Sequence, residues 1–159
     1  MIIKAFTFGL SITVISWTAG MLLTVFLRNT AYYKRSSLNF IKSGALNKAI
    51  GLGVFKWIVK NTFFKYLNQK LQLKGSTGIS RLQELRNEMT FSEISHLIGF
   101  VFVAVFAVIK LMDGLYLHAA AGMLMNIPLN LYPSLLQQQN KRQIDNMVRR
   151  YSRGIPPGP

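Results

Sequence analysis

The sequence predicts an all-α integral membrane protein with about three transmembrane helices and one amphipathic helix at the cytoplasmic interface. Half of the 159 residues are hydrophobic and only 15% are charged, whereas an ordinary soluble domain has about 25% charged residues. The apolar residues form long runs without charge, which is the pattern of helices that cross a bilayer. The 19 Lys and Arg residues outnumber 5 Asp and Glu and lie mostly outside those runs.

Composition excludes several classes of protein. The absence of cysteine excludes a disulfide scaffold, a thiolate metal site and a cysteine nucleophile. Two histidines exclude a His-rich metal cluster, and 11 Phe, 6 Tyr and 2 Trp argue against a disordered basic chain. A membrane protein or a basic, nucleic-acid-binding globule remains.

The first predicted span covers 5–27, which contains no charged residue and is bounded by Lys4 and Arg28. At a helical rise of about 1.5 Å per residue it exceeds the roughly 30 Å hydrocarbon core. A cleaved signal peptide has a shorter apolar region, of about 7–15 residues, and an Ala-x-Ala-like exit. We therefore expect an uncleaved transmembrane helix.

Two further spans are predicted over 94–112 and 114–136, with Asp113-Gly114 as the turn between them. Residues 97–109 are apolar without interruption, and 114–136 carries no formal charge. A soluble helical hairpin would need charged outer faces, which neither run has. The two runs therefore predict a helical hairpin inside a bilayer.

The segment 45–67 is rich in aromatic and apolar residues with lysines interspersed. As a span it would bury Lys56 and Lys60 near its centre, at about 2.5–3.5 kcal/mol each. An in-plane interfacial helix avoids this cost and is favoured over a spanning one. A helix over 80–93 leads into the second span. Residues 1–153 are expected to form one membrane domain, and 154–159 a disordered tail.

The positive charge is concentrated in two segments. Residues 28–92 contain twelve Lys and Arg, and five follow Leu136. The positive-inside rule places both segments in the cytoplasm, with the N-terminus outside and the C-terminus inside. Membrane lipids with anionic head groups are the expected partners, together with a homo-oligomer or a membrane protein partner. Nucleic acid is not expected, because no nucleic-acid-binding signature accompanies the charge.

Polar residues in the predicted hairpin fall at matched depths. His96 precedes Asp113 by 17 residues and Asn130 follows it by 17, so both lie roughly 25 Å from the turn. Glu93 is three residues before His96 and shares its helical face. Asn126, Asn130 and Gln137 share a face on the other helix. The spacing predicts a polar cluster near the cytoplasmic head groups.

Glu93 and His96 together favour acid–base chemistry. A carboxylate that orients an imidazole makes a general base, which here could take a proton from a hydroxyl attacking an acyl thioester. An amide or an arginine nearby would stabilise the oxyanion. The structural alternative is that these residues only hydrogen-bond between packed helices, an interpretation that applies equally to Asn126. No metal site is expected, because His96 would be the sole nitrogen ligand.

The segment from Gln137 to Arg142 begins where the third span ends. The segment favours an anion site for phosphate groups of lipid or coenzyme A. Its polar and basic side chains include Gln137, Asn140, Lys141 and Arg142. The alternative is a solvated basic helix end that holds the topology.

Glu93-x-x-His96 and the spacing of Asn130, Gln137 and Asn140 carry a family resemblance. From about 46 to 150 the sequence resembles the glycosyl-diaponeurosporenoate acyltransferases, small bacterial membrane proteins of staphyloxanthin-type carotenoid synthesis. The resemblance implies transfer of a fatty acyl group onto a sugar hydroxyl of a membrane-embedded glycolipid or glycosylated terpenoid. It implies a multi-pass protein of the bacterial cytoplasmic membrane. The sequence departs from the family at Leu97, where Trp is frequent, and at Gln138, where Arg is common.

In this interpretation His96 is the general base and Glu93 orients it. The amides position substrate or stabilise the oxyanion, and Lys141 and Arg142 hold an anionic acyl donor such as acyl-CoA, with no resident cofactor. The amides are Asn126, Asn130, Gln137 and Asn140. The alternative function is a non-catalytic membrane subunit that binds lipid or a partner protein.

Overall fold

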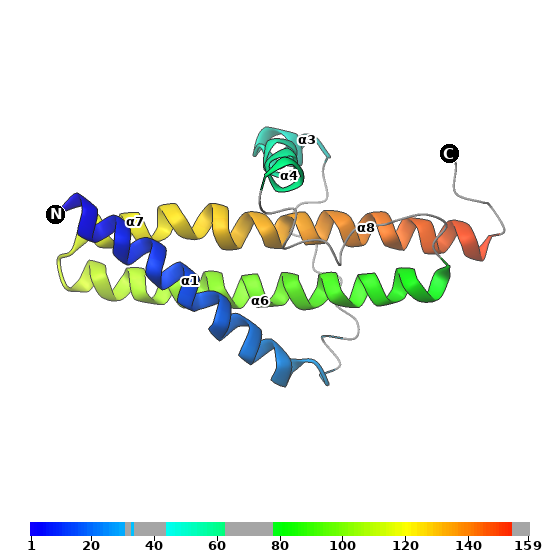
Figure 1. Cartoon of the computed structure of the whole chain (residues 1–159), viewed down its shortest axis with the longest axis horizontal. Coiled ribbons are helices and arrows are strands. Elements are labelled where there is room, and N and C mark those ends of the chain that lie inside the picture. Colours follow the sequence, from blue (N-terminus) through cyan, green and yellow to red (C-terminus); the bar gives the residue numbers. More distant parts are fainter. Residues whose placement is uncertain (31–32, 34–43, 63–77, 154–159) are drawn as a thin grey trace. The chain divides into compact units, whose positions relative to one another are not determined.

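The computed structural model describes residues 1–30, 33, 44–62 and 78–153, and all regular structure within them is helical (Figure 1). The elements are α1 (Ile2–Leu27), α3 (Gly44–Ala49), α4 (Leu52–Asn61), α6 (Ile79–Met112), α7 (Tyr116–Asn126), the π-helix η2 (Ile127–Leu131) and α8 (Tyr132–Ser152). The all-α class is confirmed. The predicted tail over 154–159 lies outside the described residues.

The chain divides into two compact units. The first comprises 1–36 and 91–134, which include α1, α7, η2 and the C-terminal part of α6. The second comprises 37–90 and 135–159, which include α3, α4, the N-terminal part of α6 and most of α8.

Helices α1 and α6 are long and apolar enough to cross a membrane. Only 28% of the most apolar window of each helix is buried inside the protein. Large apolar side chains such as Leu22 and Phe26 on α1 and Val101 and Val105 on α6 are exposed instead. The core helix of a soluble protein would enclose such side chains, so this pattern favours contact with lipid.

Helix α1 packs through a stripe of small residues. A Cβ atom on Gly9 would lie 2.7 Å from the carbonyl oxygen of Ala121 on α7, and one on Gly20 would overlap the carbonyl oxygen of Ser95 on α6. Small residues allow such close approach of helix backbones in membranes. Helix α1 therefore crosses directly over α7 and α6 in the first unit (Figure 1). The buried stripe is Ala5, Gly9, Thr13, Ser16, Gly20 and Thr24.

The predicted turn at Asp113-Gly114 ends α6 with a Schellman motif. Gly114 has φ of 71°, a left-handed conformation that glycine adopts readily. The N–H of Leu115 donates to the carbonyl of Lys110 at 2.8 Å, and that of Gly114 to the carbonyl of Leu111 at 3.0 Å. Beyond this turn, α7, η2 and the start of α8 follow one another across the third predicted span.

The segment predicted as one interfacial helix over 45–67 differs in the structure. Helix α3 ends at Ala49 and α4 begins at Leu52, because Gly51 between them has a left-handed φ of 73°. Residues 63–67 lie outside the described part. In α4, Val54 and Trp57 are exposed. Burial lowers the pKa of Lys56, and the positive charge of Lys60 lowers it further.

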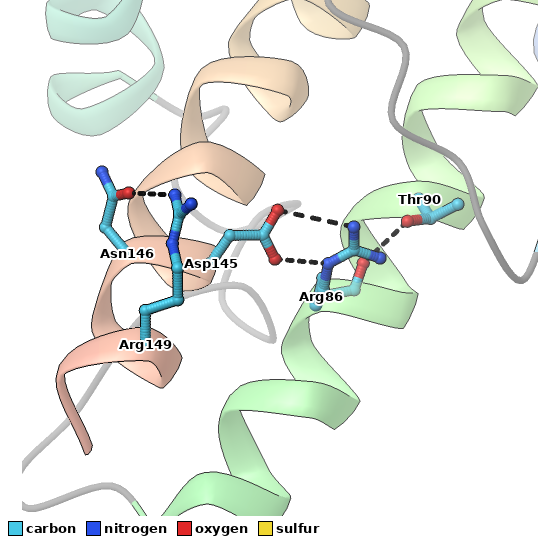
Figure 2. Close-up of polar contacts among 5 residues, drawn as sticks. All are labelled: Arg86, Thr90, Asp145, Asn146 and Arg149. Carbon is cyan, nitrogen blue, oxygen red and sulfur yellow. Dashed lines mark hydrogen bonds and ion pairs between the residues drawn. The ribbon is translucent and has the colours of Figure 1, made fainter. Parts of the chain in front are cut away.

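In the second unit, the start of α6 packs against α8. Leu82, Leu85 and Met89 form an apolar core with Ile144. Beside the core, Nε of Arg86 donates to Oδ1 of Asp145 at 2.6 Å and Nη2 donates to Oδ2 at 3.4 Å (Figure 2). Thr90, one turn along α6, donates its hydroxyl to the Arg86 carbonyl at 2.9 Å.

Candidate active site

Polar side chains are buried in the first unit among α1, α6, α7 and η2. Glu93, Asn126 and Asn130 have no exposed surface. Burying a polar group without a hydrogen bond costs several kcal/mol on apolar-transfer scales, on the order of 2–7. The hydrogen bonds of Asn126 and Asn130 therefore determine how the site is built.

The π-helix η2 carries Asn130. Pro128 near its start supplies no backbone N–H, and its ring crowds the carbonyl four residues earlier, which favours a wider turn. The N–H of Tyr132 accordingly donates to the carbonyl of Ile127, five residues back. Single π turns inside helices occur frequently at functional sites.

A chain of side-chain hydrogen bonds begins at a backbone carbonyl. Nδ2 of Asn126 donates to the carbonyl oxygen of Phe100 at 3.0 Å, which turns Oδ1 of Asn126 toward its neighbour. Asn130 donates Nδ2 to this Oδ1 at 2.8 Å and to Oγ of Ser16 at 3.0 Å. The hydroxyl of Ser16 in turn donates to the carbonyl of Thr13 at 2.6 Å. Both hydrogens of the Asn130 amide nitrogen are thus used within the protein.

The chain of hydrogen bonds determines which ring nitrogen of His96 carries the hydrogen. Since Nδ2 of Asn130 faces Ser16 and Asn126, its Oδ1 faces His96 and lies 3.3 Å from Nδ1. An amide oxygen only accepts, so Nδ1 of His96 carries the hydrogen in this contact. In the neutral imidazole the lone pair is then on Nε2. Nε2 is the atom that can act as a base.

Glu93 lies one turn before His96 on α6, and its side chain is fully buried. The sequence suggested that Glu93 orients the imidazole. The hydrogen bond at Nδ1 of His96 is made with Oδ1 of Asn130. An orienting contact therefore comes from η2, and Glu93 lies buried on the same face of α6.

Sequence reasoning missed Ser16 and Gly99. A Cβ atom on Gly99 would lie 2.9 Å from Oδ1 of Asn130 and 3.1 Å from Oγ of Ser16, so glycine leaves room for this contact. A second pair of hydroxyls joins α1 and α6 separately: Ser95 donates to Oγ1 of Thr24 at 3.0 Å. The available sequence signal for Ser16 was the spacing of small residues in α1, at steps of three or four.

The remaining predicted site residues lie on α8 in the second unit. Gln137 and Lys141 are four residues apart and buried, with 4% and 3% of their surfaces exposed. Asn140 and Arg142 are half-buried. The hydrogen bonds of Asn130 with His96, Ser16 and Asn126 are made within the first unit.

A basic hollow of about 400 Å³ lies near the end of α8. It is lined by Asn146, Arg149, Arg150 and Arg153, which share one face of the helix. Nη2 of Arg149 donates to Oδ1 of Asn146 at 2.6 Å, as Figure 2 shows. Arginine guanidinium groups suit phosphate and carboxylate ligands.

Metal-ligating side chains do not gather in the described part of the chain: no group of three His, Cys, Asp or Glu residues there could hold a metal ion.

Comparison with known proteins places these features in a family. Neither the curated proteins nor the solved structures gave a match. Residues 29–150 match the model of a family described as glycosyl-4,4'-diaponeurosporenoate acyltransferase. The matched region contains His96, Asn130 and every other site residue predicted from the sequence, whereas α1 precedes it. Because the match covers well over half of the sequence, the chain belongs to the glycosyl-4,4'-diaponeurosporenoate acyltransferase family.

Proposed function

We propose that the protein transfers a fatty acyl group from an activated donor to a sugar hydroxyl of a membrane-embedded glycolipid or glycosylated terpenoid. Family membership implies an acyltransferase of carotenoid synthesis. The observation that carries the proposal is the buried hydrogen-bond chain that presents Nε2 of His96 as an unprotonated base.

The reaction begins with the acceptor hydroxyl hydrogen-bonded to Nε2 of His96. The hydroxyl oxygen attacks the acyl carbonyl of a thioester donor, forming the new ester C–O bond while its proton passes to Nε2. The C–S bond then breaks, and the imidazolium returns the proton to the departing thiolate. The buried carboxylate of Glu93 favours the transient imidazolium electrostatically.

The amides divide into two roles. Asn130 and Asn126 hold His96, because Asn130 donates its amide hydrogens to Ser16 and Asn126, and Asn126 donates to a backbone carbonyl. Gln137 and Asn140 are proposed to contact substrate. Lys141 and Arg142 are proposed to bind the anionic part of a donor such as acyl-CoA, as cationic side chains do for phosphates.

We also propose three spans in a bacterial cytoplasmic membrane, with the N-terminus outside, the C-terminus inside and the reaction at the cytoplasmic face. The exposed apolar side chains of α1 and α6 support membrane insertion. The placement of 17 of the 19 Lys and Arg residues in 28–92 and after Leu136 supports the orientation.

The test is lipid profiling of bacteria that produce the protein, His96→Ala or Glu93→Gln. General-base catalysis contributes about 100-fold or more, so His96→Ala should reduce the acylated glycolipid by at least that factor. Glu93→Gln should reduce it less. His118→Ala is the matched control, because His118 on α7 makes a ring contact with Phe8 and none with the hydrogen-bond chain.

The acyltransferase assignment fails if His96→Ala inserts normally and its acylated lipids equal those of the unmodified protein. A loss that His118→Ala shares to the same degree would also contradict the role of His96.

A second candidate function is a non-catalytic subunit that binds anionic lipid, and the basic hollow on α8 favours it. This function predicts that Arg149→Gln with Arg150→Gln reduces binding to vesicles containing phosphatidylglycerol, whereas His96→Ala changes no lipid product. Vesicles of phosphatidylcholine alone are the control.

A further inference from the structure

Ser16 lies on α1, before the residues that match the family, and its side chain is fully buried. It is the residue through which α1 contacts the hydrogen-bond chain of the candidate site. Its hydroxyl accepts from Nδ2 of Asn130 at 3.0 Å and donates to the carbonyl of Thr13 at 2.6 Å. Both the donor and an acceptor position of the hydroxyl are therefore occupied.

The chain from Phe100 to Ser16 is anchored at both ends by backbone carbonyls. At one end Asn126 donates to the carbonyl of Phe100, and at the other Ser16 donates to the carbonyl of Thr13. A backbone carbonyl cannot donate, so each group between the anchors has its direction fixed. With Ser16 as an acceptor, the Asn130 amide cannot rotate by half a turn without placing its oxygen against two other oxygens.

We propose that Ser16 is a positioning residue: it fixes the amide of Asn130 and thereby holds the hydrogen of His96 on Nδ1. Helix α1 is then part of the functional site as well as a membrane anchor. The catalytic consequence rests on the proposed function, in which Nε2 takes a proton from the acceptor hydroxyl. The tautomer itself does not depend on that function.

Removing the Ser16 hydroxyl leaves one hydrogen of the buried Asn130 amide without its acceptor, at a cost of order 1–3 kcal/mol. Without the Ser16 oxygen, a rotated amide faces one opposing oxygen, Oδ1 of Asn126, instead of two, so the rotated orientation becomes accessible beside the original one. The rotated amide presents Nδ2 to His96. Nδ1 would have to accept from it, which moves the ring hydrogen to Nε2. We therefore expect a single tautomer with Ser16 and a mixture without it.

The experiment is ¹⁵N NMR of protein labelled at histidine, in detergent micelles at about pH 8, above the ordinary histidine pKa of about 6.5. Ring nitrogens with and without a hydrogen have distinct ¹⁵N shifts, and His118→Gln identifies the signals of His96. The samples are the unmodified protein, Ser16→Ala and Thr24→Ala. Thr24 is the matched control, because it is a buried α1 hydroxyl bonded to Ser95 and to its own helix, apart from this chain.

The proposal predicts an Nδ1–H signal alone for His96 in the unmodified protein and in Thr24→Ala. Ser16→Ala should add an Nε2–H form. An Nε2–H form in the unmodified protein would overturn the tautomer assignment, whether or not any variant folds. An unchanged spectrum for Ser16→Ala, or an equal change in Thr24→Ala, would overturn the role of Ser16.

The acyl-transfer assay separates this inference from the proposed function. If Ser16→Ala adds the second tautomer while His96→Ala keeps its acylated lipid, the positioning role stands and the proposed function fails. If His96→Ala loses the acylated lipid while Ser16→Ala keeps the single Nδ1–H tautomer of His96, the proposed function stands and this inference fails.

Discussion

Asn130 uses its whole side-chain amide inside the protein. Its two nitrogen hydrogens go to Ser16 and Asn126, and its oxygen accepts from His96. A fully satisfied buried amide holds its neighbours in one arrangement, whereas a partly satisfied one is costly. Asn130 therefore has no side-chain hydrogen left to donate to an oxyanion, which supports the proposal that it orients His96.

Gly99→Ala is predicted to disturb this arrangement. The new methyl group would lie 2.9 Å from Oδ1 of Asn130 and 3.1 Å from Oγ of Ser16, so one of them must move. We expect a loss of about 1–3 kcal/mol in unfolding free energy, together with reduced acyl transfer. Gly122→Ala is the control, because its methyl group meets only Phe8, at 3.9 Å. Denaturant titration in detergent measures both, and equal stability of the two variants would contradict the prediction.

The sequence predicted His96 and Asn130 as site residues but could not predict Ser16. Equal counts from the turn at Asp113 place His96 opposite Asn130 in any regular hairpin, and their side chains are hydrogen-bonded. Ser16 is 114 residues from Asn130, and no periodicity in α1 specifies which helix it crosses. That contact depends on the crossing of α1 over the hairpin, which packing determines.

At the scale of elements, composition predicted the helices better than their irregularities. Long charge-free runs specify α1 and the apolar part of α6, because length and hydropathy determine whether a helix can span a bilayer. The left-handed Gly51 and the π turn η2 were not predicted. A glycine or proline in a helical pattern predicts a break or a kink but does not fix its geometry.

The approach of α1 to α6 gives a prediction for the pair of helices. In Gly20→Ala the added methyl group overlaps the Ser95 carbonyl, so α1 must move away from α6. The hydrogen bond between Ser95 and Thr24 would then lengthen or break. We expect destabilisation by about 1–3 kcal/mol. Thermal unfolding followed by circular dichroism measures it.

Gly53→Ala on α4 is the control for Gly20→Ala. No atom lies within 4 Å of a Cβ atom added there, and alanine is the better helix former by up to about 1 kcal/mol. Gly53→Ala should therefore keep or raise stability. If Gly20→Ala unfolds at the same temperature as the unmodified protein, the close packing of α1 on α6 is contradicted.

For the molecule as a whole, apolar and cationic surfaces are separated along the chain. Exposed large apolar side chains concentrate on α1, on the C-terminal part of α6 and on α7, whereas the end of α8 presents the arginines of the basic hollow. A bilayer stabilises the first kind of surface and the anionic inner leaflet attracts the second. The proposed topology follows from this separation together with the distribution of Lys and Arg.

The absence of cysteine allows the topology to be tested with single-cysteine variants. The proposed orientation places Ile2 and Leu115 outside and Ala45 and Ser152 inside, and all four residues are exposed. A membrane-impermeant maleimide should therefore label Ile2→Cys and Leu115→Cys in intact cells. Ala45→Cys and Ser152→Cys should react only after the membrane is disrupted. If Ile2→Cys and Ala45→Cys are labelled from the same side, α1 does not cross the membrane. If Leu115→Cys is protected in intact cells, as Ser152→Cys is expected to be, the hairpin does not span the membrane.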